Sequence, residues 1–240
     1  MSSIPRAASL TLWLDAWLRG AASPDDVLAS LDPSFHQVFL GLDPERPLAT
    51  FEALGAIRLL TTRVSVALTA AGDPAGLAGP PSFNAAAMDA GEALLLPDAG
   101  VGLVPAVVGG AVEWLCLPAN APAPLDRREA RQVLRSTLRE VTGDLAEQQI
   151  ATWSSEIPDL MMNPRDAVLA PPGMAPQDHD TLNSAALCLD IVAAARQIEP
   201  GTISAWERSR FDEAMRRLDS AARRALVALC GSSSDNLSPS

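Results

Sequence analysis

The stretch GEALLLPDAGVGLVPAVVGGAVEWLCLP, residues 91–118, is the longest apolar stretch of the chain. It contains three short apolar runs separated by turn-forming residues: 92–97, 101–108 and 111–117. Gly109 and Gly110 join the last two runs, and a glycine pair between apolar runs is typical of a tight β-hairpin turn. The stretch therefore predicts three consecutive antiparallel strands.

Placing Gly109 and Gly110 at the turn decides which residues of the hairpin face each other. One face is then apolar, with three cross-strand pairs: Val107 with Val112, Pro105 with Trp114, and Leu103 with Cys116. Pro105 has no N–H to donate, and in this register the missing donor points toward residues 92–97. We therefore expect the pairing with that strand to stop near Pro105.

The glycines fit neither a nucleotide-binding loop nor a membrane span. The segment Gly100–Gly102 lacks the third glycine, the following helix and the later acid of a dinucleotide-binding fingerprint. The uncharged span between Asp98 and Glu113 is too short to cross a bilayer as a helix. The stretch is therefore interpreted as sheet with turn glycines.

The rest of the chain predicts one more strand and several helices. Alternating residues predict a strand near 62–70. Apolar residues at three- and four-residue spacing, with capping residues before them, predict helices over 7–19, 23–31, 47–60, 82–91, 125–153, 180–199 and 202–230. Residues 157–179 hold many prolines and predict a long loop.

These elements predict an α+β fold, in which a small antiparallel sheet of about four strands packs against N- and C-terminal helices. We expect a single domain over residues 1–230, with helices and sheet in 1–117 and a helical layer in 125–230. The polar residues 231–240 predict a disordered tail.

Composition limits the possible partners. The net charge is −11, and all 18 basic residues are arginines. A surface that is acidic overall argues against general binding to nucleic acid or to an anionic membrane. The N-terminal residues lack the pattern of a signal peptide. Three dispersed cysteines, Cys116, Cys188 and Cys230, predict neither a disulfide framework nor a zinc site and indicate a cytoplasmic location.

The histidines are the first candidates for chemistry. His179 lies between Asp178 and Asp180, a set that offers imidazole and carboxylate ligands or an acid/base centre. Adjacent residues rarely converge on one metal, so we expect no metal or cofactor and interpret Asp180 as a helix cap. His36 lies among apolar residues and is expected to be partly buried.

An arginine row is the second candidate. Arg127, Arg131, Arg135 and Arg139 follow each other at four-residue steps, which keeps them near one face of a helix. Arginine suits carboxylate or phosphate recognition. The row predicts salt bridges to acids of 202–230, such as Asp212, Glu213 and Asp219; an anion site at Arg131, Arg135 and Arg139 is the alternative, and nucleic acid is the least favoured.

The segment GDPAGLAGPPSFNAAAMDAGEALLLPD, followed by GLVPAVV and AVEW, resembles a family of uncharacterised proteins from GC-rich, actinobacterial-type genomes. The segments LDRREARQVLRSTL and ARRALVAL are similar to that family too, so the resemblance spans most of residues 50–230. It implies a protein without an assigned activity and carries over no site residues.

Three hypotheses about function follow. The first is a non-catalytic protein-interaction or scaffold module, with a protein partner or a second copy of the chain, because no catalytic cluster is evident. The second is a protein that binds a small anionic ligand at the row Arg131–Arg135. The third is an enzyme centred on His179.

Overall fold

A computed structural model describes residues 4–147, 168–197 and 205–231. The predicted tail after Gly231, the end of the predicted helix 125–153 and residues 157–167 of the predicted loop lie outside the described residues. The chain divides into two compact units: unit 1 is Met1–Leu125, Ala170–Met174 and Val227–Ser240, and unit 2 is Asp126–Leu169 and Ala175–Leu226. The single domain expected over residues 1–230 stays a prediction.

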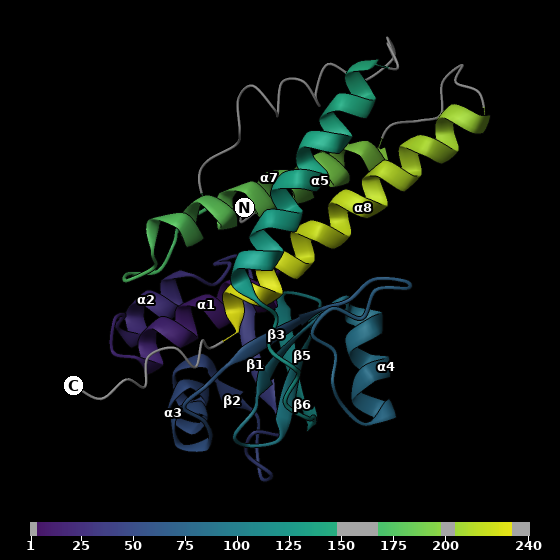
Figure 1. Ribbon diagram of the computed structural model, residues 1–240. Helices are drawn as coiled ribbons and strands as arrows, with labels where there is room; N and C mark the ends of the chain where they lie inside the picture. Colours follow the sequence, from purple (N-terminus) through teal and green to yellow (C-terminus); the bar gives the residue numbers. More distant parts are fainter. Residues whose placement is uncertain (1–3, 148–167, 198–204, 232–240) are drawn as a thin grey trace. The chain divides into compact units, whose positions relative to one another are not determined.

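Unit 1 is built around a mixed sheet (Figure 1). Within the described residues it has six strands in the order β2-β1-β6-β5-β4-β3. Their bounds are β1 His36–Leu40, β2 Leu48–Ala49, β3 Ser65–Leu68, β4 Glu92–Leu96, β5 Val101–Val108 and β6 Ala111–Pro118. The α+β class is confirmed, but a purely antiparallel sheet of about four strands is wrong, because β1 runs parallel to β6.

The hairpin β5–β6 has the predicted register. Val107 pairs with Val112, Pro105 with Trp114, and Leu103 with Cys116. The pairs between β4 and β5 end at Leu94 and Leu103, two residues short of Pro105. The missing proline donor therefore costs no ladder hydrogen bond, as expected.

The two strands that the sequence did not predict lie on the far side of β6. β1 pairs with residues 111–115 of β6, 75 positions later in the chain, so no local turn signal marks it. β2 has only two residues and leads directly into the next helix. His36 begins β1 and is exposed, so the expectation of a partly buried histidine is wrong.

Helices cover both faces of the sheet (Figure 1). The helices of this part of the chain are α1 Arg6–Leu18, α2 Pro24–Ala29, α3 Thr50–Leu60 and α4 Pro81–Ala90. α1 packs on β3 and β4, and α4 packs on β4, β5 and β6. Because side chains alternate along a strand, Leu94 and Trp114 point toward α1, while Leu95 joins Phe83 of α4 in a buried cluster.

Local sequence explains where several helices begin and end. Ser23 accepts the N–H of Asp26 while the Asp26 carboxylate accepts the N–H of Ser23, a complete capping box for α2. Gly91 ends α4 with a φ of 76°, a left-handed conformation that glycine adopts without strain. α1 begins after Pro5, whose side chain has no hydrogen-bonding group that could cap the helix.

Unit 2 consists of long helices: α5 Arg127–Glu147, α7 Pro176–Gln197 and the larger part of α8 Ala205–Cys230. Leu134 and Val141 form the buried side of α5, whereas Val133 is exposed. The last turn of α8 belongs to unit 1, where the Cys230 thiol donates to the carbonyl of Ala8. Among the described residues, no helix combines the length and the apolarity that a membrane span requires.

Candidate functional site

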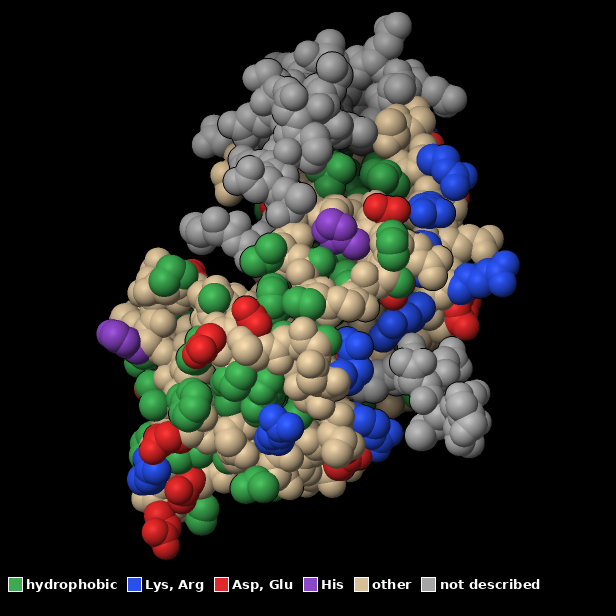
Figure 2. Space-filling model, turned by 90° about the vertical axis from the view of Figure 1, so that its left-hand side faces the viewer, with side chains coloured by type: hydrophobic (Ala, Val, Ile, Leu, Met, Phe, Trp, Pro, Cys, Tyr) green, Lys and Arg blue, Asp and Glu red, His purple; other side chains and the backbone are tan. Residues whose placement is uncertain are grey.

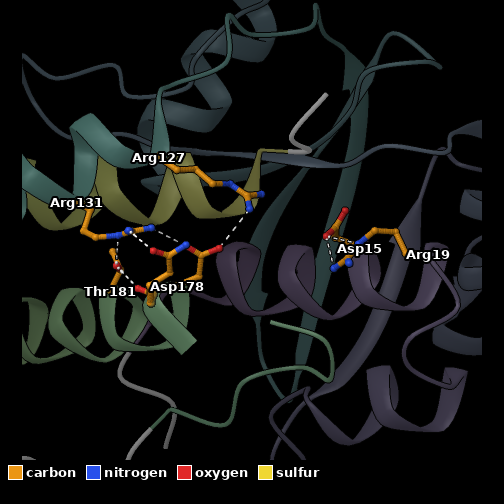
Figure 3. A network of polar contacts seen from close by, with 7 residues as sticks. Asp15, Arg19, Arg127, Arg131, Asp178 and Thr181 are labelled. Atoms are coloured by element: carbon orange, nitrogen blue, oxygen red, sulfur yellow. Dashed lines mark hydrogen bonds and ion pairs between the residues drawn. The ribbon is translucent and has the colours of Figure 1, made fainter. Parts of the chain in front are cut away.

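The arginine row of α5 is joined to the first turn of α7 (Figure 3). Arg131 donates from NH2 to Asp178 Oδ1 at 2.8 Å, from Nε to Thr181 Oγ1 at 3.1 Å, and from NH1 to Gln177 Oε1 at 3.0 Å. Arg127 NH1 lies 3.4 Å from Asp178 Oδ2. The carboxylate of Asp178 is thus held between two guanidinium groups. The positive charge of Arg131 is therefore already paired with a carboxylate of the chain itself.

Asp178, His179 and Asp180 lie on α7, and the helix directs Asp178 and Asp180 to different sides. α7 begins at Pro176, so Asp180 lies inside its first two turns and is not the cap. Asp178 is buried on the side of α5, while Asp180 is exposed. Histidine side chains are visible at the surface in Figure 2, where acidic and basic side chains are interspersed. Across the described ranges, no group of three or more potential ligands could hold a metal ion.

Arg135 and Arg139 lie further along α5 and are exposed. Neither forms an ion pair with any residue that the structure describes. The acids expected opposite them pair elsewhere, since Asp212 binds Arg208 and Glu213 binds Arg216 of the same helix. Where α5 and α8 do form ion pairs, the polarity is reversed: Arg217 of α8 lies 3.1 Å from Asp144 of α5.

A pocket in unit 1 brings together residues that the sequence did not connect. We call it the α1 pocket, with a volume of about 530 Å³. Ile4 and Pro5, together with Arg6 and Ser9 of α1, form one wall, and the segment after α2 (Ser30–Ser34) forms another. Gln37 of β1, Glu92 of β4 and Trp114 of β6 contribute side chains from the sheet. Its volume lies in the range of small-molecule sites.

Glu92 is the half-buried acid of this pocket. Its Oε2 accepts a hydrogen bond from the backbone N–H of Ala7 at 2.7 Å. Since α1 has neither a capping side chain nor an acid in its first turn, Glu92 supplies the cap from β4. Burial raises the pKa of the Glu92 carboxyl, while the Ala7 hydrogen bond and the charge of Arg6 oppose this.

Arg6 is the basic residue of the α1 pocket. Its guanidinium carbon lies 5.3 Å from the ring centre of Phe35, a cation–π contact. Its Nε is buried and has no hydrogen-bond partner among the described residues. The N–H of Ser34 chiefly lowers the pKa of Asp32, and the charge of Arg6 lowers it further, although Arg6 forms no ion pair with Asp32 or Glu92 within the described chain.

The floor of the pocket is fixed by contacts of its own. Trp114 Nε1 donates to Gln37 Oε1 at 2.9 Å, and Gln37 Nε2 donates to the carbonyl of Phe35 at 3.3 Å. The ring of Trp114 stacks on Phe39, with 5.9 Å between centroids and 8° between planes. These polar groups are therefore occupied, and Arg6 and Glu92 remain the groups best placed to bind a ligand.

Two domains of one family match this chain in succession. The N-terminal domain of Rv1486c-like proteins matches residues 7–129, and the C-terminal domain matches residues 128–227. The chain belongs to the Rv1486c-like protein family. The boundary between the two matches falls at the start of α5, close to the boundary between units 1 and 2.

Two relatives of this Rv1486c-like protein come from Mycobacterium tuberculosis. Uncharacterised protein Rv1486c of strain H37Rv is 32% identical over a segment covering 45% of this chain and 46% of the relative. Uncharacterised protein MT1533 of strain CDC 1551 gives the same values. The match thus spans about half the length of the curated relatives. No solved structure matches the chain significantly. The resemblance to an uncharacterised actinobacterial family is confirmed.

Proposed function

We propose that this Rv1486c-like protein binds a small molecule in the α1 pocket. The observation that carries the proposal is the Nε of Arg6, which is buried without a hydrogen-bond partner among the described residues. Leaving a buried donor unsatisfied is costly, and the cost is avoided when a ligand supplies the acceptor. Arg6 lines the α1 pocket, so a shift of its guanidinium would bring this donor to a ligand held there.

Binding is favoured over catalysis by the composition of the pocket. Its lining contains neither histidine nor cysteine, and one oxygen of the Glu92 carboxylate already accepts the N–H of Ala7. Nucleophilic catalysis needs a nucleophile next to a base that activates it. An enzyme centred on His179 is less favoured, because its neighbour Asp178 is committed to Arg131. An anion site at Arg135 and Arg139 stays an alternative proposal.

A ligand screen on the full chain tests the proposal. We expect at least one small metabolite to raise the melting temperature, as any ligand selective for the folded state does. The increase should disappear in Arg6→Gln and persist in Arg46→Gln, an exposed arginine of unit 1 that pairs with Glu52 outside the pocket. If every metabolite that binds does so equally in Arg6→Gln, the α1 pocket is not the site.

Protein interaction is the second candidate, and the end of the β5–β6 hairpin favours it. Val107 and Val108 are 53% and 51% exposed there. A second copy of the chain is the partner we propose, because burying exposed apolar side chains against each other needs no complementary charge. The net charge of −11 opposes this association, so it should strengthen at high salt. Light scattering that gives a monomer at all concentrations would exclude it. We also propose a cytoplasmic location, which the absence of a disulfide at Cys116, Cys188 and Cys230 within the described residues supports.

A further inference from the structure

We infer that the α1 pocket takes a molecule that carries no net charge, with an apolar body and a head that both accepts and donates hydrogen bonds. An apolar α-amino acid, with its carboxylate and ammonium group, is the simplest molecule of this class. The inference rests on the proposed function, since it specifies the ligand of the same pocket. It differs from an anion site, which would need only positive groups.

The charged groups of the pocket carry the inference. Arg6 is close enough to Glu92 and to Asp32 to affect both carboxyls electrostatically. It nevertheless forms no ion pair with either, within the part of the chain that the structure describes. Opposite charges that line one pocket without contact leave a gap that a dipolar head can bridge. Its acceptor would face Arg6 and its donor a carboxylate.

The balance of charge argues against an anion. The pocket contains one guanidinium, of Arg6, and two carboxyl groups, of Asp32 and Glu92. With both carboxyls ionised the pocket is negative, and with Glu92 protonated it is neutral. A free anion would be attracted by Arg6 but repelled by Asp32. A zwitterionic or uncharged head therefore fits better.

The remaining surface fits an apolar body. Ile4, Leu31, Pro33 and Trp114 contribute apolar atoms to the lining. Trp114 is fully buried and its indole N–H is bound to Gln37, so it closes this side of the pocket without a free polar group. Capping of α1 explains the position of Glu92 without any ligand. It does not explain the unsatisfied Nε of Arg6 or the open volume beside it.

Matched compounds can separate the two halves of the head. Leucine has carboxylate and ammonium groups, 4-methylpentanoate lacks the amine, and 3-methylbutylamine lacks the carboxylate; phenylalanine with its acid and amine gives a second series. We expect each amino acid to bind the full chain at least about tenfold more tightly than its truncated partners in calorimetric titrations, because each lost charged hydrogen bond costs that much or more.

Variants assign each half to a residue. In Arg6→Gln, the amino acid should bind no more tightly than the amine that lacks its carboxylate. In Glu92→Gln, the amino acid should lose part of its higher affinity over the acid that lacks its amine. Glu52→Gln is the matched control, because Glu52 accepts the N–H of Ala49 at the start of α3 and lies outside the pocket. It should leave all affinities unchanged.

The outcomes distinguish the two proposals. If the acids bind through Arg6 as tightly as the amino acids, or the control changes affinity as much as Glu92→Gln, the inference about the head is overturned while ligand binding stands. If neither series binds but another metabolite depends on Arg6, the inference again fails alone. If no compound of the wider screen depends on Arg6, the proposed function fails with it.

Discussion

The carboxylate of Glu92 accepts a hydrogen bond from the backbone nitrogen of Ala7, 85 residues earlier in the chain, at 2.7 Å. The first residue of β4 therefore caps the start of α1. This contact lies at the edge of the α1 pocket, so a change in the charge of Glu92 affects both the stability of unit 1 and the proposed ligand site.

Glu92→Gln should make stability less dependent on pH. Burial raises the pKa of the Glu92 carboxyl in the folded protein, so the folded state holds this proton more tightly than the unfolded state. The resulting stability is fully present below the ordinary pKa of 4.5 and is lost as the pH rises through the folded value. We therefore expect the free energy of unfolding, measured in urea, to be more favourable for the variant relative to the wild type at pH 7 than at pH 4. A constant difference between the two proteins would contradict this.

Arg131→Gln should destabilise unit 2 by about 2 kcal/mol, since it removes hydrogen bonds that a buried carboxylate receives from a charged donor. The side chain of Arg131 is only 16% exposed and bonds Asp178. Arg135→Gln is the control, one helical turn away on α5 and exposed. It should change the free energy of unfolding by less than about 0.5 kcal/mol. Equal effects in denaturant titrations would show that the contact with Asp178 does not matter.

Gly102→Ala should lower stability by about 1–3 kcal/mol through overpacking. A Cβ at position 102 would collide with the ring of Phe83, which is fully buried in the cluster under α4. A Cβ at Gly110, in the hairpin turn, would meet nothing within 4 Å. Thermal unfolding of Gly102→Ala and Gly110→Ala compares the two positions, and similar losses would argue against the close contact with Phe83.

Asp98→Asn should cost about 1 kcal/mol at neutral pH, the net value of a typical hydrogen-bond loss at a partly exposed site. Asp98 accepts from Arg63, from the N–H of Thr62 and from both threonine hydroxyls at 61 and 62. The Arg63 hydrogen bond, followed by the Thr62 N–H, holds the pKa of Asp98 well below its usual range. The wild-type advantage should therefore be complete above pH 4 and shrink as the carboxylate is protonated in acid. An advantage that persists unchanged at pH 2 would refute this.

Cys188 should resist thiol reagents in the folded protein. Burial raises its pKa to about 12, so the reactive thiolate is almost absent at pH 8. Mass spectrometry after iodoacetamide treatment should find Cys188 unmodified without denaturant and alkylated in urea. Rapid labelling of Cys188 in native protein would mean that α7 opens readily.

Much of the sheet follows from local sequence. A two-residue loop at Gly109 and Gly110 fixes which residues pair across it, so the register of β5 and β6 could be derived residue by residue, including the pairing of Pro105 with Trp114. β1 could not be derived in this way. Its partner strand lies far along the chain, and nothing in His36–Leu40 alone says that it runs parallel to β6.

The candidate sites were harder to derive than the fold. The step of four residues correctly suggests that Arg127 and Arg131 share a face of α5, and both contact Asp178. The spacing cannot say which helix supplies the acid, because that depends on packing between helices. The α1 pocket combines Arg6, Asp32 and Glu92 from distant segments, and the one local signal is an acid at the start of an apolar strand.

The parallel pairing of β1 with β6 has a consequence for synthesis of the chain. Residues 36–40 leave the ribosome long before residues 111–115, their neighbours in the sheet. The meander β4–β5–β6 can form from consecutive segments. β1, in contrast, can join the sheet only after β6 has been synthesised. We expect nascent chains that end before position 111 to expose Phe39 and to be bound by chaperones until the last strand emerges.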